Sequence, residues 1–209
     1  MRSLAACFLL GFMVLGLQGC FPIVAGSVVA GALIVEDRRT KGALVEDQEI
    51  EFKAVSRINL KYRDDSHINV TSYDRNVLVT GEAASEAIRN DIEAIVREIE
   101  HVRNITNEVT VAGNSSLTSR SNDTLITSKV KSRFVTDGHF QANHVKVVTE
   151  NGVVYLLGIV THREAEEAAQ LASSTGGAQR VVKVFEYNDK LQGAPAKSSP
   201  PEYDSSKGR

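Results

Sequence analysis

Within residues 47–112, apolar residues follow two different periods. Ile50, Ala54 and Ile58 recur at every fourth position, which is the spacing of one apolar stripe along an α-helix. Apolar and polar residues then alternate on both sides of a short polar turn, a pattern typical of two half-buried strands in a hairpin. A second helical stripe begins at Ile88, and another alternating segment follows it. The pattern predicts the order helix, strand, strand, helix, strand.

The same order is repeated over residues 122–189. The two segments align at an offset of 76 or 77 residues, with two compensating one-residue shifts in loops, as a duplicated unit would show. Ile126, Val130 and Phe134 repeat the first helical stripe. Since the last strand of each unit returns through a helix, we expect it to run parallel to its neighbour after a right-handed crossover. We therefore predict an α+β fold of two tandem units, each a three-stranded mixed sheet with two helices on one face.

Local signals mark the ends of these elements. Asp123 is expected to cap the start of its helix, because a carboxylate can accept hydrogen bonds from the free amides there. Asn151-Gly152 favours a tight hairpin turn, since both residues tolerate a positive φ. Residues 113–121 are interpreted as a linker and residues 190–209 as a disordered tail. Because a unit of this size buries only about 60% of its unfolded surface, packing of the units together, or against a third surface, would stabilise them.

The N-terminus has the features of an export signal. Arg2 is followed by an apolar run over residues 4–17 and by a Leu-Gln-Gly-Cys sequence ending at Cys20, which resembles a bacterial lipobox. This resemblance implies that residues 1–19 are a signal peptide and that Cys20 carries diacylglycerol and palmitate. More than one acyl chain anchors a protein stably. The alternative is an uncleaved membrane helix, since apolar residues resume over residues 21–35.

Residues 20–46 are interpreted as the lipidated cysteine and a tether. The apolar part, residues 21–35, is too short to span a bilayer, so it is either apposed to the membrane or packed against the folded part. Phe21 follows the cysteine, where inner-membrane retention signals usually carry aspartate. By resemblance to sorted lipoproteins, this implies a location in the outer membrane of a Gram-negative bacterium, facing the periplasm.

The charge distribution separates the two units. The whole chain has 24 basic and 26 acidic residues, so it lacks the basic footprint that nucleic-acid binding needs. Residues 47–112 hold eight basic and thirteen acidic side chains, a net charge of −5, whereas residues 121–189 hold seven and eight, a net charge of −1. An anionic membrane repels the first unit, and only the second can approach it without a penalty.

The sequence shows no catalytic or metal-binding constellation. Its five histidines are not spaced to bring three or four ligands together, so we interpret them as solvated loop residues and expect no metal. These histidines are His67, His101, His139, His144 and His162. Glu164, Glu166 and Glu167 open a helix, where the dipole favours negative charge. Since the sequence has neither a Gly-rich phosphate loop nor a nucleophile elbow, we expect no cofactor and no enzyme activity.

The duplicated pattern resembles a BON domain, with the two domains at residues 47–112 and 122–189. The motifs that carry the resemblance are Ile68-x-Val70 and Val77-x-Val79-x-Gly81 in the first unit, and Asn122-Asp123-Thr124, Thr149-Glu150-Asn151-Gly152 and Arg163-Glu164-Ala165 in the second. With the lipobox, they are similar to the dual BON-domain outer-membrane lipoproteins, the DolP family. This resemblance implies a non-enzymatic protein of envelope integrity whose BON domains bind anionic phospholipid. A poorly matching helix in the first unit and the tail after Tyr187 depart from the family pattern.

The first helix of the second unit offers a candidate lipid contact. On a helical wheel of about 100° per residue, Leu125 lies away from the core stripe, with Lys129, Ser132 and Thr136 within roughly 40° of it and Val135 at the edge of the same face. An exposed leucine beside a lysine suits insertion among lipid headgroups, although a stray apolar side chain is also common on a solvated surface. Together with the family resemblance, this pattern predicts that these five residues bind anionic phospholipid.

Two functions from different classes remain open. The first is a phospholipid-binding module, anchored in the outer membrane, that maintains envelope integrity. The second is a non-catalytic periplasmic scaffold or chaperone-like factor, which binds envelope proteins through its sheet faces or its acidic first domain. Binding to vesicles of differing anionic content separates these two functions.

Overall fold

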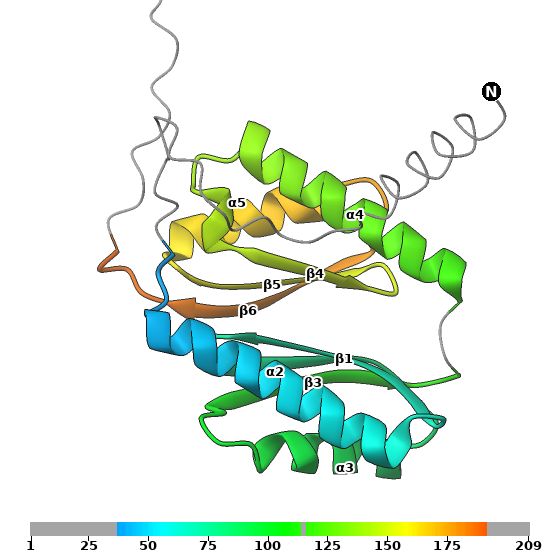
Figure 1. Cartoon of the computed structure of the whole chain (residues 1–209). Coiled ribbons are helices and arrows are strands. Elements are labelled where there is room, and N and C mark those ends of the chain that lie inside the picture. Colours follow the sequence, from blue (N-terminus) through cyan, green and yellow to red (C-terminus); the bar gives the residue numbers. More distant parts are fainter. Residues whose placement is uncertain (1–36, 114–115, 192–209) are drawn as a thin grey trace, which may run out of the picture. The chain divides into compact units, whose positions relative to one another are not determined.

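The computed structural model of the chain describes residues 37–113 and 116–191 (Figure 1). The predicted signal peptide, Cys20, residues 21–35 and almost all of the predicted tail lie outside the described residues. The first unit comprises α2 (Lys41–Tyr62), β1 (Ser66–Tyr73), β2 (Asn76–Ala83), α3 (Glu86–Arg97) and β3 (Asn104–Val111). The second comprises α4 (Leu117–Thr136), the 3₁₀ helix η2 (Ala142–His144), β4 (Lys146–Glu150), β5 (Val153–Val160), α5 (His162–Ser173) and β6 (Arg180–Tyr187). In the described part of the chain, no helix is both long and apolar enough to cross a membrane.

Each unit holds a three-stranded mixed sheet, which confirms the predicted fold. β1 and β2 are antiparallel, and β3 lies parallel to β2 on its other side. β4, β5 and β6 repeat this arrangement. The duplication preserves the register, because Val79 lies opposite Val70 and Asn107, and its equivalent Leu156 lies opposite Val147.

The helices of each unit cover one face of its sheet and close an apolar core (Figure 1). Ile126, Val130 and Phe134 of α4 are each at most 1% exposed, and they pack against alternate residues of β4 and β5. The equivalent stripe of α2 is buried to the same extent. The rotation predicted for both helices is therefore confirmed.

The predicted capping role of Asp123 is wrong, because α4 begins earlier than expected. Ser116 is the N-cap of α4, and its side chain accepts a hydrogen bond from the amide of Ser119. Asp123 therefore lies within the helix. Its buried carboxylate accepts hydrogen bonds from the backbone amides of Asn151 (2.9 Å) and Gly152 (2.8 Å), in the turn between β4 and β5.

The first unit contains the same buried contact between helix and turn. Asp47, which is equivalent to Asp123, accepts hydrogen bonds from the amides of Asp74 (2.9 Å) and Arg75 (2.7 Å) between β1 and β2. Asp74 and Arg75 have φ values of 46° and 66°, as both central residues of a tight hairpin turn require. Charge-assisted hydrogen bonds from the turn amides fix this conformation. The duplicated carboxylate is thus part of the fold of each unit.

Two histidines are packed inside their units. His67 lies in β1 and is half-buried, and His144 lies in η2 and is buried. The interpretation of these two residues as solvated loop histidines is therefore wrong. Their backbones touch a glycine in each unit: a Cβ on Gly81 would lie 2.0 Å from the His67 carbonyl oxygen, and one on Gly158 would lie 2.3 Å from that of His144. A side chain at either glycine would push the neighbouring backbone away.

The second faces of the two sheets form a third apolar cluster, which joins the units. Tyr73 and Leu78 of the first unit are buried together with Tyr155, Leu157 and Ile159 of the second. Strands β2 and β5 are consequently buried on both faces. The two units accordingly belong to one compact body.

Replacing Phe134 with alanine is expected to lower the free energy of unfolding by about 3–5 kcal/mol, because a fully buried aromatic side chain is lost and a cavity remains. The ring packs edge-on against Phe140, with the two ring centroids 5.2 Å apart. Urea unfolding followed by circular dichroism measures the change. Leu125→Ala, at a position that is 59% exposed on the same helix, is the matched control and should change stability by less than about 0.5 kcal/mol. Equal losses in the two variants would contradict the rotation of α4.

Candidate functional site

All five predicted lipid-contacting residues lie on the exposed side of α4. Leu125 and Val135 are 59% and 63% exposed, and Lys129, Ser132 and Thr136 are exposed as well. We call these five residues the outer face of α4. Because the core stripe of an amphipathic helix points inward, the opposite side must face outward. The packing of the core therefore sets which side chains this face presents.

Hydroxyl side chains on α4 bond to the backbone of the helix itself. Thr124 donates to the carbonyl of Arg120 (3.0 Å), and Ser128 donates to the carbonyl of Thr124 (2.9 Å). Thr136 donates to the carbonyl of Ser132 (3.1 Å). A hydroxyl that already has an acceptor in the helix loses less when water is removed from it. The exposed side of α4 is therefore less costly to dehydrate than its composition indicates.

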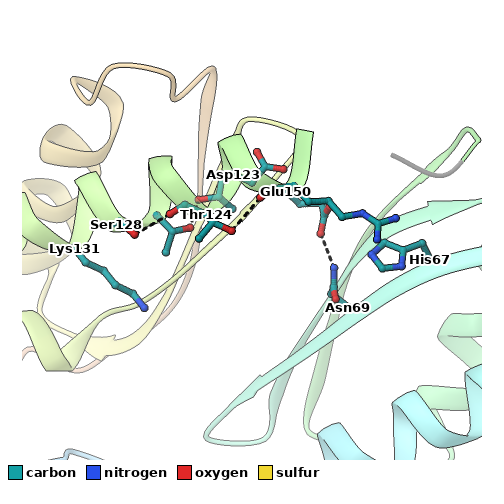
Figure 2. Close-up of a pocket in the computed structure, with 10 residues that line it drawn as sticks. His67, Asn69, Asp123, Thr124, Ser128, Lys131 and Glu150 are labelled. Carbon is teal, nitrogen blue, oxygen red and sulfur yellow. Dashed lines mark hydrogen bonds between the residues drawn. The ribbon is translucent and has the colours of Figure 1, made fainter. Parts of the chain in front are cut away.

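Two lysines give this part of α4 its positive charge, whereas a nearby arginine has a structural role. Arg133 donates a hydrogen bond of 2.9 Å to the carbonyl of Leu171, which ties α4 to α5. The Lys129 ammonium lies 3.5 Å from the carbonyl of Gly176. Lys131 is exposed and extends into a cleft beside the helix (Figure 2). The lysines are thus the charges that a ligand on this helix would meet.

The cleft beside α4 has a volume of about 510 Å³ and a polar lining (Figure 2). Arg120 and Lys131 bring positive charge to it, and Asp123 and Glu150 bring negative charge. Among residues 37–113 and 116–191, no group of three or more His, Cys, Asp or Glu side chains is arranged to hold a metal ion. The cleft therefore offers a ligand hydrogen bonds and charges of both signs, which are non-covalent contacts.

Glu150 closes the cleft against the first unit and is 8% exposed. Its carboxylate accepts a hydrogen bond of 2.8 Å from Asn69 (Figure 2). Burial raises the pKa of Glu150, the hydrogen bond from Asn69 opposes this shift, and the nearby carboxylates of Glu82 and Asp123 add to it. The junction of the two units therefore holds a carboxylate whose ionised form is disfavoured by its surroundings.

Arg38 and Glu164 form a buried ion pair that sequence reasoning missed. The Arg38 guanidinium donates two hydrogen bonds of 2.8 Å to the Glu164 carboxylate and one of 2.8 Å to the carbonyl of Ile159. Burial by itself would raise the pKa of Glu164, but the hydrogen bonds from Arg38 and Thr161 hold that pKa below its usual range. Glu164 also completes a capping box with Thr161 at the start of α5, so its predicted place in the helix is correct. Because Arg38 precedes α2, the pair fastens the start of the first unit to the second.

Comparisons with known proteins identify the two units. The model of the BON domain family matches residues 46–113 and 122–189. Outer membrane lipoprotein DolP of Haemophilus influenzae is 36% identical over 175 residues, which cover 83% of this chain and 91% of that protein. The chain belongs to the DolP family of dual BON-domain lipoproteins. Membership of the DolP family places it in the outer membrane of a Gram-negative bacterium, lipid-anchored and facing the periplasm.

Two other relatives of this DolP-family chain are more distant. The 21 kDa hemolysin of Actinobacillus pleuropneumoniae is 29% identical over 153 residues, covering 72% of this chain and 79% of the relative. Osmotically-inducible protein Y of Escherichia coli strain K12 is 26% identical over 159 residues, covering 73% of this chain and 78% of the relative. DolP is named as a lipoprotein and not as an enzyme.

Replacing Glu150 with glutamine is expected to stabilise the protein at pH 7. Since the folded-state pKa of Glu150 is raised above its ordinary value of 4.5, the stability that this group contributes is fully present below about pH 4.5 and is lost as the pH rises through the folded-state pKa. Glutamine keeps an oxygen that can accept the hydrogen bond from Asn69 and carries no charge. Thermal unfolding between pH 4 and pH 7 should therefore show a higher midpoint for Glu150→Gln at pH 7 and a smaller difference from the parent at pH 4.

The control for this experiment is Glu100→Gln, because the Glu100 side chain is 79% exposed. It should follow the parent at every pH. A Glu150→Gln variant less stable than the parent at pH 7 would show that the ionised carboxylate is favoured at the junction.

Proposed function

We propose that this DolP-family protein maintains envelope integrity by binding anionic phospholipid through the outer face of α4, and that it acts without catalysis. The observation that carries the proposal is the exposure of two large apolar side chains, Leu125 and Val135, on a helix that also presents Lys129 and Lys131. A helix with such a surface lies in the plane of a membrane, with its apolar side chains among the headgroups. Hydroxyls that bond within the helix lower the cost of that contact.

The lipid contact is weak without an anchor. Burial of one leucine-sized side chain contributes about 1.5–3 kcal/mol, and each lysine near an anionic surface contributes roughly 1 kcal/mol. Two side chains of each kind supply less than the roughly 8 kcal/mol of micromolar binding, once the cost of association is subtracted. A lipid anchor makes the second contact intramolecular and removes most of this cost. The protein-lipid contact and the anchor therefore work together.

Cys20 is the residue that we propose carries the anchor, as its place at the end of the lipobox implies. Sixteen residues, 21–36, separate Cys20 from Asp37, where the described part of the chain begins. An extended tether of this length reaches roughly 50 Å. This reach lets α4 meet the surface of the membrane that holds the anchor.

The negative charge of the first unit favours the second unit as the lipid-binding domain. Some acidic side chains of the first unit are engaged by the second: Glu51 pairs with Lys146 at 3.0 Å, and Glu108 pairs with Arg180 at 3.3 Å. The remaining acidic side chains are repelled by an anionic surface. The second unit meets no such penalty.

Packing of the two units buries one of the two surfaces on which a protein-binding scaffold could act. The sheet faces that point away from the helices are buried against each other through residues such as Leu78 and Leu157. They cannot receive a partner without separating the two units. The acidic first domain remains as the surface on which a scaffold function would rest.

Two substitutions in α4 are expected to weaken vesicle binding in different ways. Lys129→Glu should weaken the binding of residues 36–209 to anionic vesicles strongly at low salt and less at high salt, because the charge contribution of roughly 1 kcal/mol per lysine is screened. Leu125→Glu should weaken binding at every ionic strength, since about 1.5–3 kcal/mol of apolar burial is not screened. Co-sedimentation with vesicles across a salt series measures both effects, and circular dichroism confirms folding.

The matched control for these variants is Leu60→Glu on α2, where the parent leucine is 88% exposed. It should bind vesicles like the parent. If both folded α4 variants also bind like the parent, α4 is not the membrane site and the scaffold function is favoured.

Cys20→Ala is expected to leave an unlipidated precursor, because the variant lacks the thiol that receives diacylglycerol. That precursor should stay in the inner membrane, held by its apolar signal, or be degraded. Lipid labelling and membrane fractionation of cells that express the full chain measure the result. Normal labelling and outer-membrane fractionation of this variant would contradict the assignment of Cys20.

A further inference from the structure

The outer side of α2 carries three large apolar side chains that are mostly exposed. Val45, Phe52 and Leu60 are 65%, 75% and 88% exposed. On a wheel of about 100° per residue, Val45 lies within roughly 20° of Phe52, and Leu60 lies about 80° from it. We call these three residues the α2 stripe. It lies away from the core stripe of the same helix, which is fully buried.

The second unit shows that the fold does not require the α2 stripe. The residues of α4 at the equivalent positions, 76 residues later, are Ser121, Ser128 and Thr136. Both helices bury the same kind of core stripe, so packing of the core does not account for the apolar side chains at these outer positions of α2. Exposed apolar patches on soluble domains mark contacts with another molecule. The α2 stripe is therefore a property of the first unit that its own folding leaves unexplained.

The α2 stripe is arranged symmetrically about the middle of its helix. Phe52 lies at the centre of α2, Val45 lies seven residues before it, and Leu60 lies eight residues after it. Two copies of α2 packed side by side in opposite directions would bring Phe52 against Phe52 and Val45 against Leu60 at both ends. Such a pair needs no second kind of surface, because a two-fold contact is self-complementary.

The charges of α2 are divided in a way that fits the same arrangement. Residues 41–51 hold one basic and four acidic side chains, and residues 52–63 hold four basic side chains and no acidic one. This order suits the helix dipole, and in an antiparallel pair it also sets the acidic half of each helix against the basic half of the other. Arg57 is exposed and makes no ion pair with any of the described residues, whereas Glu49, exposed eight residues before it, pairs with Lys53 of the same helix at 2.6 Å. In the antiparallel pair, Arg57 of each copy lies next to Glu49 of the other.

We propose that the α2 stripe is the contact between two copies of this chain, packed through antiparallel α2 helices about a two-fold axis beside Phe52. A pair of helices each about 33 Å long buries less than the roughly 800 Å² per partner of a standard interface, so the dimer is weak in dilute solution. In the outer membrane the anchors confine the copies to one plane, which raises their effective concentration. The proposal does not depend on lipid binding by α4.

Disulfide cross-linking of the full chain in outer membranes tests the proposal. Phe52→Cys is expected to give a disulfide-linked dimer on mild oxidation. Val45→Cys and Leu60→Cys are expected to link to each other when both variants are expressed together. Neither should link to itself, since identical end residues lie about 21 Å (Val45) or about 24 Å (Leu60) apart along the antiparallel pair and a disulfide needs Cα atoms within about 7 Å. Leu125→Cys on α4 is the matched control, and the parent chain, in which the Cys20 thiol is proposed to carry the lipid anchor, gives the background.

A charge exchange tests the same geometry independently. Arg57→Glu is expected to lower the cross-linking of Phe52→Cys several-fold, and addition of Glu49→Arg to the same chain should restore it. Self-linkage of Val45→Cys would show a parallel pair and overturn the proposed arrangement. Cross-linking of Phe52→Cys no stronger than that of Leu125→Cys would overturn the dimer. If, in that case, Phe52→Ser weakens vesicle binding, the stripe faces lipid instead.

Discussion

The burial of the second face of each sheet is the constraint on which the rest of the structure depends. Two helices cover one face of a three-stranded sheet and leave the other face apolar, so neither unit is complete by itself. Tyr73 and Leu78 of the first unit and Leu157 of the second share one cluster. This packing makes the two units a single body. It also removes the second faces of the sheets from contact with a partner and leaves the outward sides of the helices exposed.

Two buried carboxylates, Glu164 and Glu150, lie at the junction between the units in different surroundings. Arg38 and Glu164 form an ion pair with two hydrogen bonds between guanidinium and carboxylate, and this pair ties the start of the first unit to the second. Glu150 lies at the opposite end of β5, accepts a hydrogen bond from the neutral amide of Asn69, and has a pKa that burial raises. Removing one partner of a buried ion pair destabilises a protein by far more than the intact pair stabilises it. The ion pair of Glu164 thus helps to fix how the two units join, whereas the charge of Glu150 destabilises the junction.

Periodicity predicted the fold and the orientation of the candidate site, because both depend on local spacing. The every-fourth-residue stripe of α4 placed Phe134 in the core, and that placement set Leu125 outward. Contacts between distant residues could not be predicted in this way. The amides that bind Asp123 lie 28 and 29 residues away, in the hairpin turn. Local sequence does not reveal such partners, so it predicts a helix cap instead. Arg38 lies 126 residues from Glu164, in a segment whose sequence gave no sign of a partner.

We propose the outer face of α4 as the part of the folded protein that meets lipid. Its most direct test is nuclear magnetic resonance of residues 36–209 with anionic vesicles that contain a paramagnetic lipid. We expect selective broadening of the amide signals of the outer face, with the signals of α2 unchanged; these residues are Leu125, Lys129, Ser132, Val135 and Thr136. Broadening centred on α2, or equal broadening over both units, would contradict it.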